Sequence, residues 1–167
     1  MIALMRPDSW DLPLFVHVLG AVVLFGGVGA VVLLAGAALR DDAHALMLRR
    51  TAFITTLVLV WPSYIVMRVG AQWVLDREGL DKNPPGWVGA GFAVSDGGIL
   101  VLALITVLGW LSPRRPGAGK FLVGLAVLYA IALGVAWFAM SAKPGGLTEV
   151  LRVGSERIHR PGIASGK

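Results

Sequence analysis

One histidine lies inside a long apolar segment of this chain, and it is the first residue to consider for chemistry. His17 stands in the first apolar run, whereas His44 and His159 lie in charged or polar stretches. An ionisable side chain within a membrane span suggests a functional site. A neutral imidazole can bind haem iron or a metal ion, and it can also donate a hydrogen bond to a backbone carbonyl. The sequence leaves both roles of His17 open.

Other patterns that would indicate a particular reaction are missing from the sequence. Among the 167 residues there is no cysteine, which excludes disulfides, thiolate metal sites and cysteine nucleophiles. The motifs G-x-S-x-G and H-E-x-x-H and the phosphate-binding P-loop do not occur. The apolar runs also contain no acidic residue of the kind that proton pumps need. The sequence therefore predicts no reaction.

Four stretches without Asp, Glu, Lys or Arg indicate a membrane protein. They cover residues 12–39, 51–67, 97–113 and 121–142. A helix needs about 20 apolar residues to cross the hydrocarbon layer, with about 17 as the lower limit. The whole chain is 56% hydrophobic and only 15% charged. We therefore predict an all-α, four-helix transmembrane bundle over residues 1–146, followed by a basic, largely disordered tail over 147–167.

Local signals predict where the helices begin and end. The expected helices cover residues 12–39, 50–70, 95–113 and 120–142. Pro62 should kink the second helix, because a proline removes one backbone hydrogen bond. Ser95 and Asp96 form a suitable N-cap pair for the third helix. These boundaries leave two short loops and a longer loop over residues 71–96.

The charges in the loops predict the orientation of the bundle. The short loops, residues 40–50 and 114–120, are rich in arginine and lysine, whereas the longer 2–3 loop is mixed in sign. By the positive-inside rule, the short loops face the cytoplasm, and the long loop and both termini face outward. The expected location is the bacterial inner membrane. The net charge of +5 then serves topology and contact with anionic lipid, and it does not indicate nucleic acid.

Alternating helix directions bring the candidate ligands to the outward side of the bundle. That side gathers His17, Met67, Arg68, Asp96, Trp137, Met140 and Lys143. Imidazole and thioether groups bind haem or Cu(I), and cationic side chains can pair with haem propionates. We therefore predict a cofactor site, for haem b or copper, made by His17, Met67, Arg68, Met140 and Lys143, with His17 as the metal ligand. Arg68 could instead pair with Asp96.

Small residues predict where the helices pack closely. Lipid gives no hydrophobic drive between helices, so small residues must let the backbones approach. The last helix has a stripe of small residues at a spacing of four, Ala126, Ala130 and Gly134, and the first helix has Gly26, Gly27, Gly29 and Ala30 near its middle. These residues could pack within the bundle, or they could mediate self-association or contacts with other membrane subunits.

Two segments resemble a known family. The segment of residues 14–20 (LFVHVLG), followed by Phe25-Gly26-Gly27, resembles the opening of an uncharacterised family of bacterial four-helix membrane proteins that are copper-resistance-D-like. The segment of residues 137–144 (WFAMSAKP) resembles the final helix of that family.

A more distant similarity is to the membrane protoporphyrinogen oxidase of bacteria, which binds haem b. That resemblance implies that His17 matches the histidine of its first helix. The tryptophan and arginine expected near that histidine in the first helix are missing here, as are the methionine-rich clusters of copper-handling proteins. Two hypotheses follow: a membrane protein that binds haem or a metal through His17, or a non-catalytic subunit of a larger membrane complex.

Overall fold

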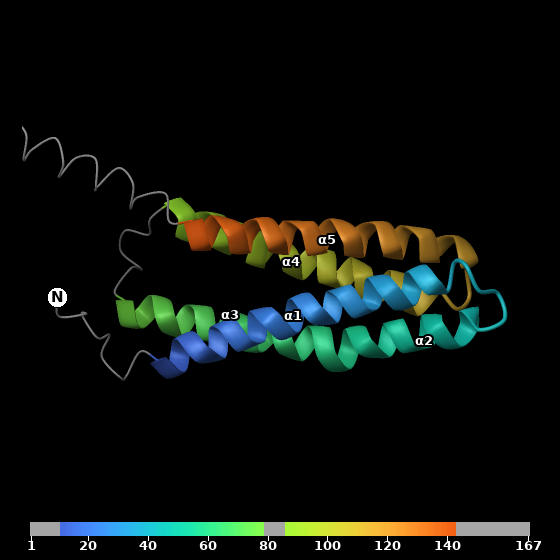
Figure 1. Ribbon diagram of the computed structural model, residues 1–167, viewed down its shortest axis with the longest axis horizontal. Coiled ribbons are helices and arrows are strands. Elements are labelled where there is room, and N and C mark those ends of the chain that lie inside the picture. Colours follow the sequence, from blue (N-terminus) through green and yellow to red (C-terminus); the bar gives the residue numbers. More distant parts are fainter. Residues whose placement is uncertain (1–10, 79–85, 143–167) are drawn as a thin grey trace, which may run out of the picture.

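The computed structural model describes residues 11–78 and 86–142, and helices dominate this part of the chain. Four long helical segments run alternately in opposite directions (Figure 1). The elements are α1 (Asp11–Ala37), α2 (Ala45–Thr55), the π-helical segment η2 (Thr56–Val60), α3 (Trp61–Glu78), α4 (Gly86–Leu111) and α5 (Pro116–Ala142). The segments α2, η2 and α3 follow one another without a break and form one span.

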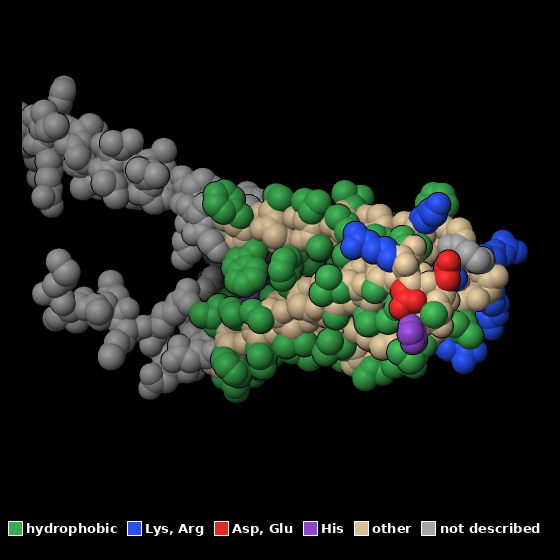
Figure 2. All heavy atoms as spheres, turned by 45° about the vertical axis from the view of Figure 1, so that its right-hand side comes forward, with side chains coloured by type: hydrophobic (Ala, Val, Ile, Leu, Met, Phe, Trp, Pro, Cys, Tyr) green, Lys and Arg blue, Asp and Glu red, His purple; other side chains and the backbone are tan. Residues whose placement is uncertain are grey.

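The surface of the bundle is that of a multi-pass membrane protein. All four long segments are long and apolar enough to cross a bilayer. Large apolar side chains project from the sides of the bundle, and Leu33 and Phe138 are each 74% exposed. Figure 2 shows these side chains along the flanks, with Lys and Arg gathered at one end. The predicted all-α, four-helix transmembrane bundle is confirmed.

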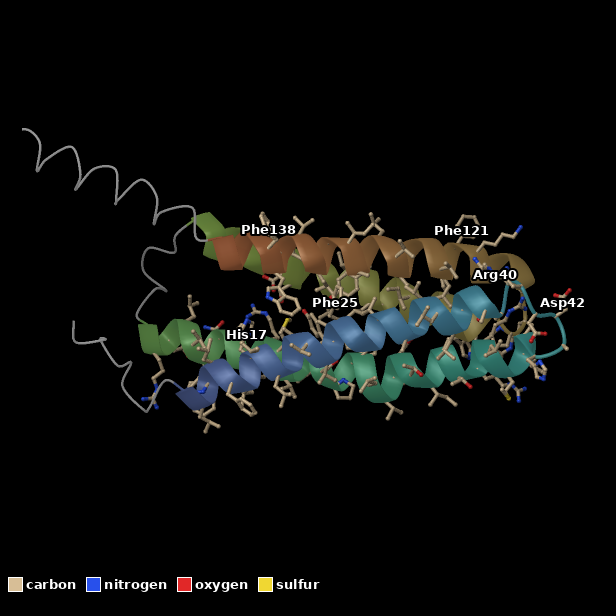
Figure 3. All side chains as sticks on the ribbon, in the orientation of Figure 1. His17, Phe25, Arg40, Asp42, Phe121 and Phe138 are labelled. Carbon is tan, nitrogen blue, oxygen red and sulfur yellow. The ribbon has the colours of Figure 1, made fainter. Side chains whose placement is uncertain are left out.

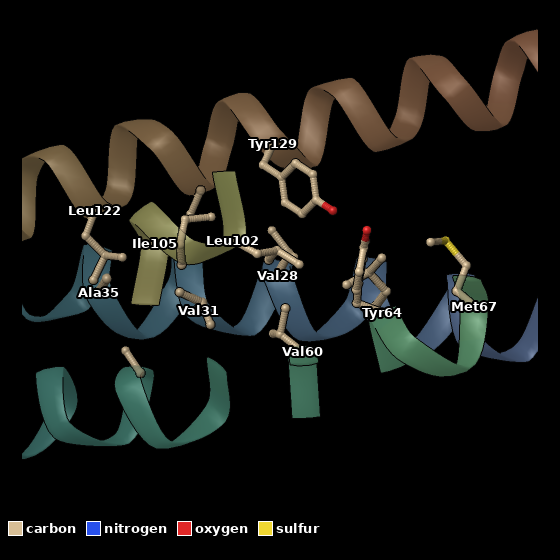
Figure 4. Packing of buried hydrophobic residues seen from close by; sticks show 13 residues of the cluster. Val28, Val31, Ala35, Val60, Tyr64, Met67, Leu102, Ile105, Leu122 and Tyr129 are labelled. Carbon is tan, nitrogen blue, oxygen red and sulfur yellow. The ribbon is translucent and has the colours of Figure 1, made fainter. Parts of the chain in front are cut away.

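The core of the bundle lies along α1, which packs against α3, α2 and α5, while α4 packs against α5. Leu24, Val28 and Val31 of α1 are almost fully buried. Other helices supply the rest of this core, which Figure 4 shows from close by, including Val60, Tyr64, Met67, Leu102, Ile105, Leu122, Ala126 and Tyr129. Two of these core residues are tyrosines, and their hydroxyl groups therefore lie inside an otherwise apolar bundle.

The boundaries of the middle helices differ from the prediction. The helix α3 continues to Glu78 and α4 begins at Gly86, so most of the predicted long loop over residues 71–96 is helical. Ser95 and Asp96 lie inside α4, and they do not cap its start. The signal failed because Ser and Asp can also occupy helix interiors, where Asp96 here pairs with Arg68 of α3. Residues 79–85 lie outside the described part of the chain, as does the predicted tail.

A π-helical segment precedes the proline of the second span. The backbone N–H of Trp61 donates to the carbonyl of Thr56, five residues earlier, where a regular α-helix would use the residue four earlier. Pro62 has no N–H to donate, and a wider turn before it accommodates the missing hydrogen bond. The sequence predicted a kink at Pro62, and the structure shows a π-helical segment shortly before this proline.

The small-residue positions are used selectively. A Cβ atom on Gly27 would lie 3.2 Å from the Val60 side chain, and Ala126 is fully buried. By contrast, a Cβ atom on Gly26, Gly29 or Gly134 would meet no non-local atom within 4 Å. Close packing within the bundle, one of the two alternatives predicted for Gly134, is therefore wrong at this position, because no other helix comes within 4 Å of its Cβ position. Packing of Gly134 against another protein stays a prediction.

The basic end of the bundle holds the two short connections. At this end, Arg49 of α2 donates from Nη1 to the carbonyl oxygen of Ser112, just beyond α4, at 3.3 Å. Arg114 lies over the ring of Trp110, 4.6 Å from its centroid. Asp41 accepts a hydrogen bond from the His44 ring, and this bond holds the pKa of that carboxyl below its usual value. These contacts tie the loop ends to the bundle while leaving most of the cations exposed.

Candidate functional site

His17 is joined to the second span by a hydrogen bond. Its Nδ1 lies 3.0 Å from the carbonyl oxygen of Met67. A carbonyl can only accept, so Nδ1 carries the proton, and in the neutral ring the lone pair is on Nε2. The carbonyl also fixes the orientation of the ring. The same arrangement holds metal-binding histidines in place, and it also satisfies a histidine that binds nothing.

Two glycines create the backbone contact that makes this hydrogen bond possible. A Cβ atom on Gly20 would lie 2.5 Å from the Met67 backbone nitrogen, and one on Gly70 would lie 2.6 Å from the His17 backbone nitrogen. Gly20 therefore faces the backbone of Met67, which lies three positions before Gly70. In the same way, Gly70 faces the backbone of His17, which lies three positions before Gly20. We call this contact of α1 and α3 the glycine seam; it consists of His17, Gly20, Met67 and Gly70.

The glycine seam was not predicted from the sequence. Gly20 and Gly70 are isolated glycines in their helices, separated by 50 positions, and no repeat marks them. Only the relative register of α1 and α3 shows that they face each other. A weak signal was available, since glycine in a spanning helix often marks a close approach of two helices.

Arg68 is the second predicted site residue that the structure places. Its guanidinium lies 3.2 Å from Oδ1 of Asp96 on α4, and it also contacts Gln72 on its own helix. The pairing of Arg68 with Asp96 was one of the two predicted alternatives for this residue. This ion pair bridges α3 and α4 at the end of the bundle where α1 begins.

The remaining predicted ligands are placed only in part. Met67 is 8% exposed, and its backbone lies in the glycine seam. Met140 lies in the last turns of α5, but its side chain lies outside the described part of the structure, as does all of Lys143. Trp137, three residues before Met140, packs edge-to-face against Phe25 of α1, with ring centroids 6.3 Å apart. The structure therefore brings His17 together with Met67, and α1 together with the end of α5.

The geometry limits what this site could bind. Within the described residues, no group of three or more His, Cys, Asp or Glu side chains could enclose a metal ion. The α1–α3 contact is closed by backbone atoms, so a ligand of His17 cannot lie there. In the view of Figure 3, His17 lies between the α1–α3 pair and the α4–α5 pair. A ligand on Nε2 would therefore lie on the side of His17 that faces away from this backbone contact.

Comparison with known proteins yields no relative. No protein-family model matches the chain, and no curated protein or solved structure matches it. The function must therefore be inferred from the residues and their geometry.

Proposed function

We propose that this chain is a bacterial inner-membrane protein that binds haem b through Nε2 of His17. The observation that supports the proposal is the hydrogen bond from Nδ1 to the Met67 carbonyl, which leaves Nε2 with its lone pair in a fixed direction. Second-shell bonds of this kind orient metal-binding histidines and increase their basicity. A cofactor site at this position would use α1 for the ligand and α3 to hold it.

The donor set favours haem over a bare metal ion. A porphyrin brings its own equatorial nitrogen ligands, so one imidazole from the protein is enough to hold the iron. A bare ion would need several protein ligands, and the described residues offer no such group of His, Cys, Asp or Glu. Met67 could add only a soft thioether. Haem would supply redox chemistry when bound, and the chain would hold its iron through the His17 imidazole in an apolar surrounding.

An absorption spectrum of the purified protein tests this proposal. With haem present during expression, we expect a Soret band for the unaltered chain and for His44→Ala, because His44 lies at the opposite end of the bundle. His17→Ala should abolish the band, and added imidazole should restore part of it. His17→Gln is the folding control, since its amide can still donate to the Met67 carbonyl but offers no imidazole ligand.

Two results would contradict the proposal that His17 binds haem. A Soret band that survives both substitutions of His17 would place the haem elsewhere. An unaltered chain that folds, yet shows no band after haem is supplied, would leave His17 as a histidine that only links α1 to α3.

A second candidate function is a non-catalytic subunit of a larger membrane complex. The observation that favours it is the set of open glycines on outward faces, where an added Cβ would meet nothing within 4 Å: Gly26, Gly29, Gly36, Gly124 and Gly134. Glycines that do not serve packing inside a bundle can serve packing between proteins in the membrane. This function requires no cofactor, so the spectrum described above also separates the two candidates.

The location proposal includes an orientation. One end of the described bundle carries six cations, Arg40, Arg49, Arg50, Arg114, Arg115 and Lys120, against two acids, Asp41 and Asp42. The other end has no such excess among described residues, since Arg68 and Arg77 stand against four acids, Asp11, Asp76, Glu78 and Asp96. By the positive-inside rule, we propose that the basic end faces the cytoplasm.

Reporter fusions check this orientation. Fusions truncated after Asp42 and after Gly117 should be active with a reporter that works only in the cytoplasm, and inactive with one that works only in the periplasm. Fusions after Arg77 should show the reverse pattern. Periplasmic activity at Asp42 and Gly117 would invert the proposed orientation without changing the fold.

A further inference from the structure

Two hydroxyl groups are buried between the helices without a hydrogen-bond partner. They are the hydroxyls of Tyr129 on α5 and Ser95 on α4, and Tyr129 is only 3% exposed. A buried hydroxyl without a partner is destabilising because it has lost its hydrogen bonds to water, so native structures rarely keep one. These two groups therefore need an explanation that the packing of the helices does not provide.

Ser95 differs from the fully buried Ser and Thr residues of the described chain. Thr56, Ser63 and Ser112 each donate to a backbone carbonyl three or four residues earlier in the chain. This local bond is the usual way in which a hydroxyl is satisfied inside a membrane helix. The Ser95 hydroxyl makes no such bond, although it is equally removed from solvent.

The two hydroxyls belong to one polar cluster. The Tyr64 hydroxyl of α3 donates to the Ser95 carbonyl at 2.9 Å, which brings α3 to this point of α4. One turn further along α4, a Cβ atom on Gly98 would lie 2.7 Å from the Tyr129 hydroxyl. Figure 4 shows the hydroxyls of Tyr64 and Tyr129 pointing toward the same space between the helices. We call this set, Tyr64, Ser95, Gly98 and Tyr129, the hydroxyl cluster.

The hydroxyl cluster lies next to a charged edge of the bundle. Asp96 follows Ser95 directly, is exposed, and pairs with Arg68. Arg68 and Asp76 both bond to Gln72, so polar groups continue along α3 on that side. This exposed, charged edge lies one residue from Ser95, so water that entered from it would not have to cross the apolar core to reach the Ser95 hydroxyl.

We propose that the hydroxyl cluster is a binding site for internal water, which accepts hydrogen bonds from the Tyr129 and Ser95 hydroxyls or donates hydrogen bonds to them. A buried water molecule normally makes about three hydrogen bonds to polar groups that would otherwise be unsatisfied. Tyr64 supplies a third group, since its hydroxyl oxygen can still accept after donating to the Ser95 carbonyl. The site thus links α3, α4 and α5 through solvent, and it requires neither haem nor the ligand role of His17.

The composition of the chain allows a direct test. Its only two tyrosines are Tyr64 and Tyr129, and both belong to the hydroxyl cluster. Tyrosine labelled with ¹³C at the hydroxyl-bearing carbon therefore reports on this site alone in the full chain reconstituted in lipid. We expect solid-state NMR to show magnetisation transfer from water to both carbons, with Tyr129→Phe assigning the two signals.

A matched pair of glycines controls this measurement. Gly98→Ala should remove the transfer to Tyr129, because the new methyl carbon would lie 2.7 Å from the Tyr129 hydroxyl oxygen, which must then shift away from its place in the cluster. Gly97→Ala should preserve it, since a Cβ atom at Gly97 meets nothing within 4 Å. If the unaltered chain transfers no more magnetisation from water to Tyr129 than Gly98→Ala does, the site is dry and the proposal is overturned.

Stability gives an independent test of the same site. If water bridges the two hydroxyls, Tyr129→Phe and Ser95→Ala should each lower the melting temperature in detergent, and the double variant should melt no lower than the less stable single variant. If the hydroxyls are unsatisfied, removing them should raise the melting temperature or leave it unchanged. Melting temperatures that rise or stay unchanged would overturn the proposal. It would also be overturned if the two substitutions lower the melting temperature non-additively while no magnetisation transfers from water, because that result would indicate a direct contact of Ser95 with Tyr129.

Discussion

Gly20→Ala and Gly70→Ala are expected to destabilise the bundle by about 1–3 kcal/mol each, the usual cost of placing an extra methyl group in a closely packed interior. At Gly20 the new Cβ would lie 2.5 Å from the Met67 backbone nitrogen, and at Gly70 it would lie 2.6 Å from that of His17. Backbone atoms cannot rotate away as a flexible side chain can. The helices α1 and α3 must therefore separate or shift along each other.

The same substitutions should disturb the proposed cofactor site. Separation of α1 from α3 lengthens the hydrogen bond between His17 and the Met67 carbonyl, which is the contact that fixes the imidazole ring. If haem binds to His17, both variants should bind it more weakly even in the fraction that remains folded. Thermal unfolding in detergent measures the first effect, and haem titration followed by absorbance measures the second.

Other glycines on α1 provide the control. Gly26→Ala and Gly29→Ala introduce the same methyl group where no atom lies within 4 Å. They should leave stability unchanged or raise it slightly, because alanine is a better helix former than glycine by about 0.5–1 kcal/mol. Equal melting temperatures for Gly20→Ala and Gly26→Ala would show that the two helices do not touch at the glycine seam.

The class of the fold could be predicted from the sequence because it depends on hydrophobic length alone. An uncharged apolar run that can span the bilayer must form a helix there, whichever neighbours it has. The residues at which the helices begin and end depend on smaller differences in free energy. The sequence placed the start of the third helix at Ser95, whereas α4 begins at Gly86 and the Ser95 hydroxyl is buried inside the bundle.

The site could be predicted only as far as topology determines it. Alternating helix directions place His17 and Met67 at the same end of the bundle, and the structure shows that they are in contact. The rotation of each helix about its axis is set by packing, and hydropathy along the chain does not encode it. The glycine seam and the hydroxyl cluster depend on that rotation, so neither could be inferred from residue types and spacing.

The rotation of a helix about its axis also decides how much a substitution changes the stability of the bundle. Two residues of the same type on one helix should therefore differ when each is replaced by alanine. Leu102 and Leu104 lie two positions apart on α4; Leu102 is fully buried in the core, whereas Leu104 is 54% exposed on the outer face. We expect Leu102→Ala to destabilise the bundle by about 2 kcal/mol, near the lower end of the range for buried leucines in soluble proteins. The lower end applies because lipid is as apolar as the core, so mainly packing contacts are lost.

Leu104→Ala should change the stability by less than about 0.5 kcal/mol, because lipid chains can fill the space that the side chain leaves. Unfolding of the two variants in the same lipid or detergent measures the difference between them. A clear difference would show that Leu102 stabilises the bundle through its contacts in the buried core cluster, and that the membrane itself does not supply this stability. Equal losses of stability in the two variants would mean that the rotation of α4 about its axis differs from the one described. Ser95 lies on the same helix, so its burial, and with it the hydroxyl cluster, would then have to be abandoned.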